Sequence, residues 1–342
     1  MKNSERLILM DPHPRRIDLI FSEEEKRRLG ALGKVLWFDG ERAAEDYIDR
    51  HIGEACALIG QTAMPKERLD RASNLRAIFN VEGNFLPNID YEECHRRNIY
   101  VMAAAPAFTQ AVAEMALGFA LAAARGIVQA DADARRGAEL YGGASNLDNF
   151  LLGGKTVGIV GFGNVGQGIG RLLEPFKCTT LVHDPWLHEH YLERFAVKPV
   201  GLEELFSRSR VVFIVSAATT ENQKGIGAEM FGRMQEGSVV VLVGRSEVVN
   251  FDDMLDAAGS GHIRAAIDVF PQEPLPPDHR ARKTPNTILS AHRAGGLPET
   301  YREMGRMVVD DLELILRDLP PQRMQRALLE TVARYRSKPI KG

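Results

Sequence analysis

Short apolar segments alternate with longer charged segments over the first hundred residues of the chain. Each apolar segment has the length of a strand, and the charged segments between them, such as 22–29 and 65–72, have helix-like composition. This alternation predicts a parallel sheet covered by helices. The expected strands are Lys34–Trp37, Ala57–Gly60, Arg76–Phe79 and Ile99–Met102.

The same alternation returns after residue 150, with strands that are more apolar. Strands that are apolar throughout are typical of a sheet buried on both faces. The sequence therefore predicts an α/β protein with two such units, although the two series show no close sequence repeat. The strands expected in the second series are Thr156–Val160, Thr180–His183, Val211–Val215, Val239–Leu242 and Arg264–Val269.

Two long segments have helical composition. Residues 107–136 are rich in Ala, Leu, Met and Glu, with Gly118 and Gly126 as interruptions, and predict one long helix. Its first half is almost wholly apolar, so we expect most of its faces to be buried, either in the core or at a subunit interface. Gly-rich polar residues 137–149 predict an exposed connection, and 300–318 predict a second helix.

Composition and charge exclude several classes of protein. The chain of 342 residues is 44% hydrophobic and 26% charged, which excludes a disordered, collagen-like or coiled-coil chain. Its formal charge, 43 basic minus 46 acidic residues, is −3, so no general attraction to nucleic acid or to an acidic membrane is expected. No uninterrupted apolar run reaches the roughly 18 residues of a membrane span.

The cysteines and the N-terminal residues favour a cytoplasmic protein. Cys56, Cys94 and Cys178 are odd in number and widely spaced, which fits a reducing compartment better than a disulfide framework. Residues 1–16 are charged and interrupted by prolines, so they lack the apolar core of a signal peptide. No metal site is expected: His188-Glu189-His190 places two imidazoles two residues apart, where they do not share a helix face.

The most specific motif is a glycine-rich turn between an apolar strand and a helix-like segment, Gly161-x-Gly163-x-x-Gly166. Gly161 permits the tight turn, Gly163 lets a pyrophosphate approach the backbone, and Gly166 lets the helix pack closely on the strand. Asn164 and Val165 lie at the helix end that offers unpaired N–H groups to phosphates. The alternative is a glycine-rich turn that only connects the strand to the helix.

Asp184 ends the next expected strand and bears on the choice of dinucleotide. Its carboxylate can accept hydrogen bonds from the adenosine ribose diol and would repel a 2′-phosphate, so the sequence favours NAD over NADP. The alternative is a solvated turn aspartate ahead of Pro185.

Further motifs follow the glycine-rich turn in order: LVGR at 242–245, AIDVFPQEP at 266–274 and SAHRAG at 290–295. Upstream lie the segment 80–90, which begins NVEG, and VAE at 112–114. Over about residues 55–310 the chain resembles the D-isomer-specific 2-hydroxyacid dehydrogenase family, which includes phosphoglycerate, glycerate, hydroxypyruvate and glyoxylate enzymes.

The resemblance implies three catalytic residues, Arg245, Glu273 and His292. A neutral imidazole can accept the hydroxyl proton of a 2-hydroxy acid while a hydride leaves carbon two, and it can return that proton in the reverse direction. Glu273 would orient the ring, and Arg245 would grip the substrate carboxylate. Taken singly, each residue has a structural alternative: a satisfied buried histidine, a surface glutamate and an ion-paired arginine.

The resemblance also implies ligand contacts. Val243, Gly244 and Asp268 match cofactor positions, the aspartate meeting the nicotinamide carboxamide, with a loop-fixing aspartate as its alternative. Backbone N–H groups of Val81-Glu82-Gly83 would bind the substrate carboxylate. Glu82 is a departure from the family pattern, because a carboxylate beside an anion site is unfavourable unless it turns away or pairs with a cation.

Other departures affect the cofactor loops and the choice of substrate. Ser246 replaces the usual glycine, Asn250 replaces an acidic residue, and the usual His-x-Pro is absent from 215–221. Phosphoglycerate dehydrogenases tend to carry an arginine where this chain has Gly60-Gln61-Thr62. A substrate phosphate needs cationic or N–H partners, so phosphoglycerate is not favoured by these residues.

The sequence thus predicts a Rossmann-type NAD-binding domain over 107–298, inserted in a flavodoxin-like substrate domain of 1–106 and 299–342. The expected function is an NAD-dependent D-2-hydroxyacid dehydrogenase or 2-oxoacid reductase, with glyoxylate, hydroxypyruvate and phosphoglycerate as candidate substrates. The alternatives are a non-catalytic NAD(H)-sensing protein, like the corepressor relatives of the family, and a dehydrogenase of formate or phosphonate. The resemblance further implies a homodimer that uses the region 107–125.

Overall fold

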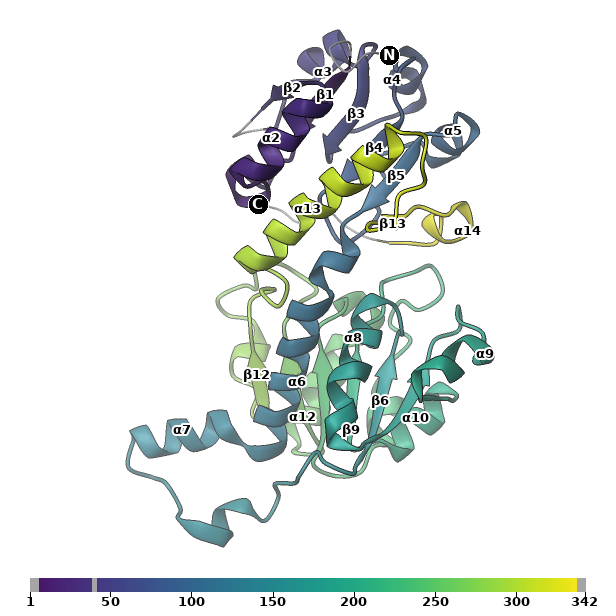
Figure 1. The fold of residues 1–342 in the computed structure, drawn as a ribbon. Coiled ribbons are helices and arrows are strands. Elements are labelled where there is room, and N and C mark those ends of the chain that lie inside the picture. The colour runs from purple at the N-terminus through teal and green to yellow at the C-terminus, as the bar shows by residue number, and fades with distance from the viewer. Residues whose placement is uncertain (1–5, 39–41, 337–342) are drawn as a thin grey trace. The chain divides into compact units, whose positions relative to one another are not determined.

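The computed structural model describes residues 6–38 and 42–336, and the chain in it divides into two compact units. Unit 1 comprises residues 1–108 and 296–342, and unit 2 comprises residues 109–295 (Figure 1). The outermost residues of the predicted first domain, 1–5 and 337–342, lie outside the described residues. Each unit has its own sheet, so the predicted two-unit α/β architecture is confirmed.

Unit 1 is built on a six-stranded sheet in the order β13-β5-β4-β3-β1-β2. All neighbours pair in parallel except the short β13, which is antiparallel to β5. The four strands expected from the sequence are confirmed to within two residues. The strand bounds are β1 Leu7–Asp11, β2 Lys34–Trp37, β3 Ala55–Gly60, β4 Ala77–Asn80, β5 Tyr100–Ala103 and β13 Gln325–Arg326.

Strand β1 was not expected from the sequence. Its five residues are all buried, and it pairs with both β2 and β3, so it lies inside the sheet. The pattern is difficult to detect, because the apolar run is short and is followed at once by Pro12 and Pro14, which are poor strand residues. This strand brings Asp11 to the carboxyl edge of the sheet, beside the end of β3.

Helices cover both faces of the unit 1 sheet, and buried apolar residues fill the layers between them. The helix expected near residue 300 is confirmed as α13, whose proline at the first position fits the start of a helix. The bounds are α1 Ile17–Ile20, α2 Glu23–Leu32, α3 Glu45–His51, α4 Lys66–Arg71, α5 Tyr91–Arg96, η2 Ala105–Phe108, α13 Pro298–Ile315 and α14 Leu329–Val332.

Unit 2 is built on a seven-stranded parallel sheet in the order β12-β11-β10-β9-β6-β7-β8. The chain starts at β6, moves outward to β7 and β8, then returns to the other side of β6 for β9. This reversal of strand order is the place where doubly wound folds bind ligands. The strands are β6 Thr156–Val160, β7 Thr179–His183, β8 Lys198–Pro199, β9 Val211–Ile214, β10 Ser238–Leu242, β11 Ile263–Ile267 and β12 Thr287–Leu289.

The helices of unit 2 flank its sheet, with a buried apolar cluster beneath α10, α11 and α12. The sequence predicted five of the seven strands and missed β8 and β12, which have only two and three residues. The helix bounds are α6 Thr109–Arg125, α7 Ile127–Arg135, η3 Gly142–Asn146, α8 Asn164–Leu173, η4 Glu174–Phe176, α9 Glu189–Leu192, η5 Glu193–Phe195, α10 Leu202–Arg208, α11 Ala228–Gly232, η6 Ser246–Val248, α12 Phe251–Gly259 and η7 Arg280–Arg282.

The single helix expected over 107–136 is wrong, because the chain breaks at Gly126. Gly126 has φ +61°, a left-handed conformation that glycine adopts without strain. The segment Ala105–Arg125 is 21 residues long with a hydropathy of 1.4, enough by length and composition to cross a membrane, and half of it is buried. Helix α6 packs on α8, β10 and β11, as a core helix does.

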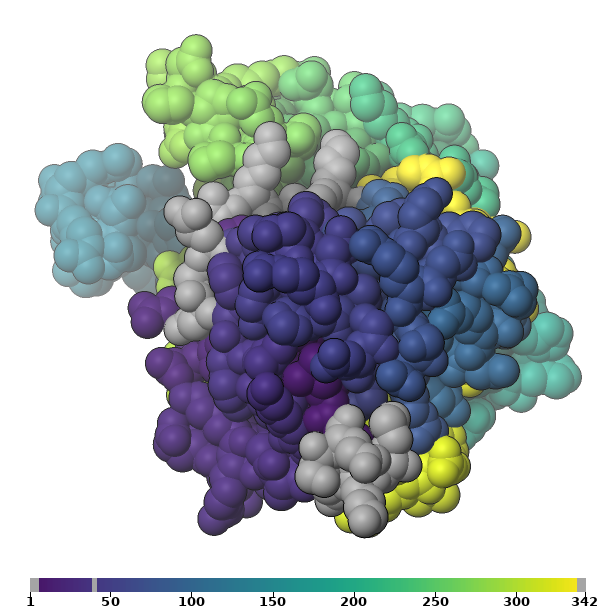
Figure 2. All heavy atoms as spheres, turned by 90° about the horizontal axis from the view of Figure 1, so that it is seen from above, coloured from purple at the N-terminus to yellow at the C-terminus, as the bar shows by residue number. Residues whose placement is uncertain are grey.

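Residues 126–151, which we call the arm, project from the body of unit 2 in two views at right angles (Figures 1 and 2). Arg264 of β11 fixes the base of the arm by donating to Ala123 O at 2.8 Å, Asp148 O at 2.7 Å and Asn149 Oδ1 at 2.9 Å. No residue of α7 is buried. The exposed connection expected at 137–149 is therefore confirmed as part of this arm.

Candidate active site

The glycine-rich turn joins β6 to α8, as the sequence predicts, and each glycine has a distinct steric reason. A Cβ on Gly161 would lie 2.6 Å from Ser216 Cα, and this glycine has φ +89°. A Cβ on Gly166 would lie 2.3 Å from Gly161 O, so helix and strand are in close contact there. A Cβ on Gly163 would meet nothing within 4 Å, so this backbone is open to an approaching group. The turn fits a dinucleotide pyrophosphate.

The loops that follow β6, β9 and β10 are packed against one another at the switch point of the sheet. A Cβ on Gly244 would lie 2.8 Å from Val215 Cα and from Ser216 O, so Ser216 is enclosed by Gly161 on one side and Gly244 on the other. Val243 is buried, and both its N–H and that of Gly244 donate to Ile214 O. Only glycine allows this close approach of three loops.

Asp184 follows β7 directly and contacts the glycine-rich turn. Its Oδ2 accepts from Phe162 N–H at 2.7 Å, and its Oδ1 accepts from Trp186 N–H at 3.0 Å. The bond from Trp186 N–H is the contact expected of a turn aspartate. The bond from Phe162 N–H attaches the carboxylate to the glycine-rich turn. The negative charge is therefore held at a fixed place beside the turn.

A turn centred on Asn222 stands where the family pattern has His-x-Pro. Asn222 Oδ1 accepts from Thr219 N–H at 2.8 Å, and its Nδ2 donates to Ala217 O at 2.8 Å. Ser246 is buried at the start of η6, and the N–H of Asn250 donates to Ile226 O at 2.7 Å. These three departures thus give ordered loops, and the role of Asn222 was not found from the sequence.

His292 and Glu273 are in direct contact. His292 Nδ1 lies 2.7 Å from Glu273 Oε2, and Glu273 Oε1 accepts from Phe270 N–H at 3.0 Å. An ionised carboxylate only accepts, so Nδ1 carries the donated proton and Nε2 is the nitrogen left for a ligand. Both side chains are about one-third exposed, so solutes can reach the pair.

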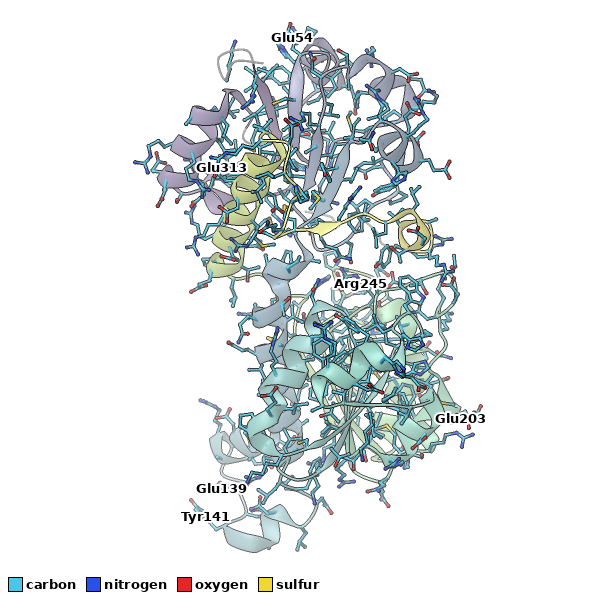
Figure 3. The ribbon with its side chains drawn as sticks, turned by 45° about the vertical axis from the view of Figure 1, so that its right-hand side comes forward. Glu54, Glu139, Tyr141, Glu203, Arg245 and Glu313 are labelled. Carbon is cyan, nitrogen blue, oxygen red and sulfur yellow. The ribbon has the colours of Figure 1, made fainter. Side chains whose placement is uncertain are left out.

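The Glu273 carboxylate is held in its ionised form. Burial raises its pKa, but the hydrogen bonds from His292 and from Phe270 N–H outweigh burial and hold that pKa below its ordinary value. The positive charge of Arg245 lowers the pKa of Glu273 further. Arg245, which is labelled in Figure 3, is the third residue after β10, and its Nη1 donates to Gly244 O at 2.8 Å. The three predicted catalytic residues thus form one electrostatic group within unit 2.

Asp268 fixes the backbone that carries His292. The aspartate is 1% exposed; its Oδ1 accepts from Arg293 N–H and its Oδ2 from Ala294 N–H, both at 3.0 Å. Its backbone oxygen accepts from His292 N–H at 2.7 Å. His292 has φ +48°, a conformation that costs a non-glycine residue about 1 kcal/mol and persists where the surroundings enforce it. Asp268 therefore fixes this loop, and its contact with nicotinamide stays a prediction.

In unit 1, the segment Val81-Glu82-Gly83 follows β4 at the carboxyl edge of the sheet. The departure at Glu82 is explained by Arg15, whose Nη2 lies 2.8 Å from Oε1 and 2.9 Å from Oε2, donating to the latter. The N–H of Glu82 donates to Asn80 Oδ1 at 3.0 Å, so this N–H is already bonded inside the loop. From the sequence, Arg15 and Arg16 suggest a basic pair on a solvated face. That interpretation is wrong for Arg15, which is 12% exposed and paired with Glu82, a residue that no spacing rule connects to it.

Among the described residues, no group of three or more His, Cys, Asp or Glu side chains is placed to hold a metal ion. All three cysteines fall within those residues and are unpaired.

Comparison with known proteins agrees with this geometry. The family model described as "D-isomer specific 2-hydroxyacid dehydrogenase, NAD binding domain" matches residues 117–294. A glyoxylate reductase of Korarchaeum cryptofilum is 31% identical over 291 residues, covering 84% of this chain and 87% of that protein. The protein belongs to the D-isomer-specific 2-hydroxyacid dehydrogenase family. It is thereby placed among oxidoreductases that act on the CH–OH group of hydroxy acids.

Solved structures give the same fold. The crystal structure of a phosphoglycerate oxidoreductase from Rhizobium etli has a TM-score of 0.87 and 42% identity, covering 96% of this chain and 99% of that chain. An NADPH-dependent glyoxylate/hydroxypyruvate reductase of Sinorhizobium meliloti shares the fold at a TM-score of 0.72 and 22% identity, over 97% of this chain and 100% of that chain. The predicted two-domain fold with its Rossmann-type NAD-binding domain is confirmed.

Proposed function

We propose that this protein is an NAD-dependent D-2-hydroxyacid dehydrogenase that also works as a 2-oxoacid reductase. The observation that carries the proposal is the 2.7 Å contact between His292 and Glu273, at the carboxyl edge of a sheet that also holds a dinucleotide-binding turn. In the mononucleotide-binding fold, reacting groups gather at this edge.

The cofactor site consists of the glycine-rich turn with Asn164 and Val165, the Asp184 carboxylate, and the backbone of Val243 and Gly244. The open space at Gly163 is where the pyrophosphate would approach, and the first-turn N–H groups of α8 would bind its oxygens. When bound, the nicotinamide ring supplies the hydride. Each carboxylate oxygen of Asp268 accepts one backbone N–H and has a further lone pair. Through these lone pairs Asp268 would accept a hydrogen bond from the nicotinamide carboxamide.

His292 moves the proton. In reduction, the imidazolium donates from Nε2 to the carbonyl oxygen of the 2-oxo acid, and in oxidation neutral Nε2 accepts the hydroxyl proton. Glu273 stabilises the imidazolium because its carboxylate is ionised and lies against Nδ1. Asp268 keeps the ring in place by holding the backbone on both sides of His292.

Arg245 binds the substrate carboxylate through its planar guanidinium, which can form two parallel hydrogen bonds to a carboxylate. Backbone N–H groups of Val81, Glu82 and Gly83 would also serve as donors to a substrate carboxylate. The N–H of Glu82 would then share its hydrogen with Asn80 Oδ1. Glyoxylate, hydroxypyruvate and phosphoglycerate are the candidate substrates, and the neutral residue Gln61 directly after β3 favours the two without phosphate.

The test is loss of NADH absorbance with glyoxylate, hydroxypyruvate, phosphohydroxypyruvate and pyruvate, with formate and phosphonate assayed in the oxidative direction. We expect turnover with at least one of the oxo acids. Tight NADH binding without turnover of any of them would contradict the proposal and favour the NAD(H)-sensing alternative. Turnover of phosphohydroxypyruvate alone would overturn the preference for substrates without phosphate.

Asp184 decides between the two dinucleotides in this proposal. Asp184→Asn removes the charge but keeps an acceptor for Phe162 N–H. We expect the ratio of kcat/KM with NADH to kcat/KM with NADPH to fall about tenfold or more, because a like-charge contact with the 2′-phosphate is lost. Steady-state kinetics with both cofactors measure the ratio. Asp252→Asn, on the exposed face of α12, is the control and should keep it; an unchanged ratio in Asp184→Asn contradicts the assignment.

We also propose a homodimer, formed through the region 107–125 together with the arm. Six of the eleven exposed large hydrophobic side chains in the described part of the chain lie on the arm, and Tyr141 at its tip is 87% exposed (Figure 3). Exposed apolar groups of this kind mark protein interfaces. The six are Ile127, Val128, Leu140, Tyr141, Leu147 and Leu151.

The triple variant Leu140→Ser, Tyr141→Ser, Leu147→Ser should be monomeric at micromolar concentration, because it removes three apolar anchors without touching the base of the arm. Sedimentation velocity measures the mass. The control variant Leu319→Ser, Leu328→Ser removes exposed leucines of unit 1 and should stay dimeric. A monomeric unmodified protein would overturn the dimer.

Within the cell we propose a cytoplasmic location, since unpaired cysteines suit a reducing compartment.

A further inference from the structure

Arg15 connects the N-terminal segment of unit 1 to the loop that follows β4. Its Nε donates to Val81 O at 3.0 Å, and its Nη2 forms the ion pair with Glu82. One guanidinium therefore binds both the backbone and the side chain of consecutive residues. The exposed fractions of the two charged side chains are 12% and 8%, so the pair is shielded from water.

Aromatic side chains enclose the same guanidinium. The Arg15 guanidinium carbon lies 4.7 Å from the centre of the Tyr301 ring and 5.9 Å from that of Phe108. A Cβ on Gly83 would lie 3.4 Å from the Phe108 ring, so the loop packs on the ring that also faces Arg15. Cation–π contacts of this kind strengthen when water is excluded.

Two further bonds of the loop also lie within unit 1. Ala104 N–H donates to Glu82 O at 2.8 Å, and Asn80 Nδ2 donates to Asn84 O at 2.8 Å. These bonds come from the ends of β5 and β4, which are rigid parts of the sheet. Arg15 comes from outside these strands, and it binds the side chain of Glu82.

We propose that Arg15 is a positioning residue for the oxo acid: it holds the Val81–Gly83 loop in the shape that binds the substrate carboxylate, with Glu82 as its counter-ion. The inference rests on the proposed function. Because the Glu82 carboxylate is paired, its charge does not repel an anionic substrate. Because the Arg15 cation is also paired, it does not supply a site for a substrate phosphate.

Positioning of the substrate loop differs from simple support of the fold, and two variants distinguish these roles. Arg15→Gln leaves the Glu82 carboxylate buried without its cation, which lowers stability as well as disturbing the loop. The double variant Arg15→Gln, Glu82→Gln removes both charges and restores much of the melting temperature. The bond to Val81 O is lost in both variants, because glutamine is too short to replace the guanidinium.

The experiment measures KM for the preferred oxo acid, Kd for NADH and the melting temperature. We expect KM to rise about tenfold in Arg15→Gln and to stay raised in the double variant, with Kd for NADH unchanged. Arg15→Lys keeps the charge without the planar fork and should give an intermediate KM. Arg28→Gln is the matched control: Arg28 pairs with Asp310 and Glu313 in the same unit, so this variant should lower the melting temperature and keep KM.

Two results would overturn the positioning role: an unchanged KM in Arg15→Gln, or a KM that returns to the unmodified value together with the melting temperature in the double variant. Binding of oxamate, an unreactive analogue of a 2-oxo acid, to the NADH complex provides a readout without turnover. An unmodified protein that neither turns over an oxo acid nor binds oxamate would overturn the proposed function and this inference together. Activity with no effect of Arg15 overturns this inference alone.

Discussion

Replacing His292 with glutamine should lower kcat for reduction of the preferred 2-oxo acid by about 10²–10⁴-fold, the usual contribution of a positioned general acid. Glutamine can hold a hydrogen bond to Glu273, but its amide does not release a proton to the carbonyl oxygen of the substrate. The Kd for NADH should remain unchanged, because the glycine-rich turn and Asp184 lie on other loops. Single-turnover absorbance and NADH titration measure the two quantities.

Two further variants define what the His292 result means. His262→Gln alters a half-buried histidine of unit 2 that contacts Phe231 O, and it should keep full activity. Glu273→Gln keeps the ring in place but removes the charge that stabilises the imidazolium. Since reduction needs the imidazolium, kcat for reduction should also fall in this variant, by a smaller factor than in His292→Gln. Full activity in His292→Gln would mean that another group supplies the proton.

The charge that Glu273→Gln removes is present in the unmodified protein. Its pKa is below the ordinary value, so the carboxylate is already ionised across the pH range in which imidazoles gain and lose protons. The stability that the lowered pKa contributes is present above the ordinary carboxyl pKa and is lost as pH falls through the lowered one. The Glu273 carboxylate therefore keeps its charge near neutral pH.

Local patterns predicted most of the architecture of this protein. The apolar strands of unit 2 form a sheet buried on both faces, and such strands are distinct in sequence because nearly every position is apolar. Strand β1 was missed because five buried residues next to two prolines carry too little signal. The break at Gly126 was also missed: glycine is compatible with both a helix and a left-handed end, and the bonds from Arg264 that fix the end are distant in sequence.

In the candidate site, too, local motifs could be predicted from the residues themselves and contacts between distant residues could not. The glycine-rich turn is a local motif, so steric requirements at Gly161 and Gly166 could be predicted residue by residue. The contact between His292 and Glu273 could be predicted only through the family resemblance, since the residues lie on different loops. Arg15 could not be predicted at all, because its partner Glu82 is 67 residues away and no motif connects the two.

The second large effect is expected at Arg245. Arg245→Gln should lower kcat/KM for the oxo acid by about 10²–10³-fold, because in the proposed function the guanidinium both binds the carboxylate and places positive charge near the carbonyl. Most of the loss should appear in KM, with a smaller loss in kcat, since the carboxylate contact exists in the ground state as well as in the transition state. Steady-state kinetics over a wide range of oxo acid concentrations separate the two.

Arg245→Lys distinguishes charge from geometry. Lysine keeps the positive charge but offers no planar pair of donors. We therefore expect kcat of the lysine variant to lie close to that of the unmodified protein, while its KM stays raised. The pH profile gives an independent check: Arg245 also lowers the pKa of Glu273, so the glutamine variant should weaken ionisation of that carboxylate at acidic pH, whereas the lysine variant should preserve it. A glutamine variant with unchanged KM would show that the Val81–Gly83 loop alone binds the substrate carboxylate, and Arg245 would then be a structural residue of the loop after β10.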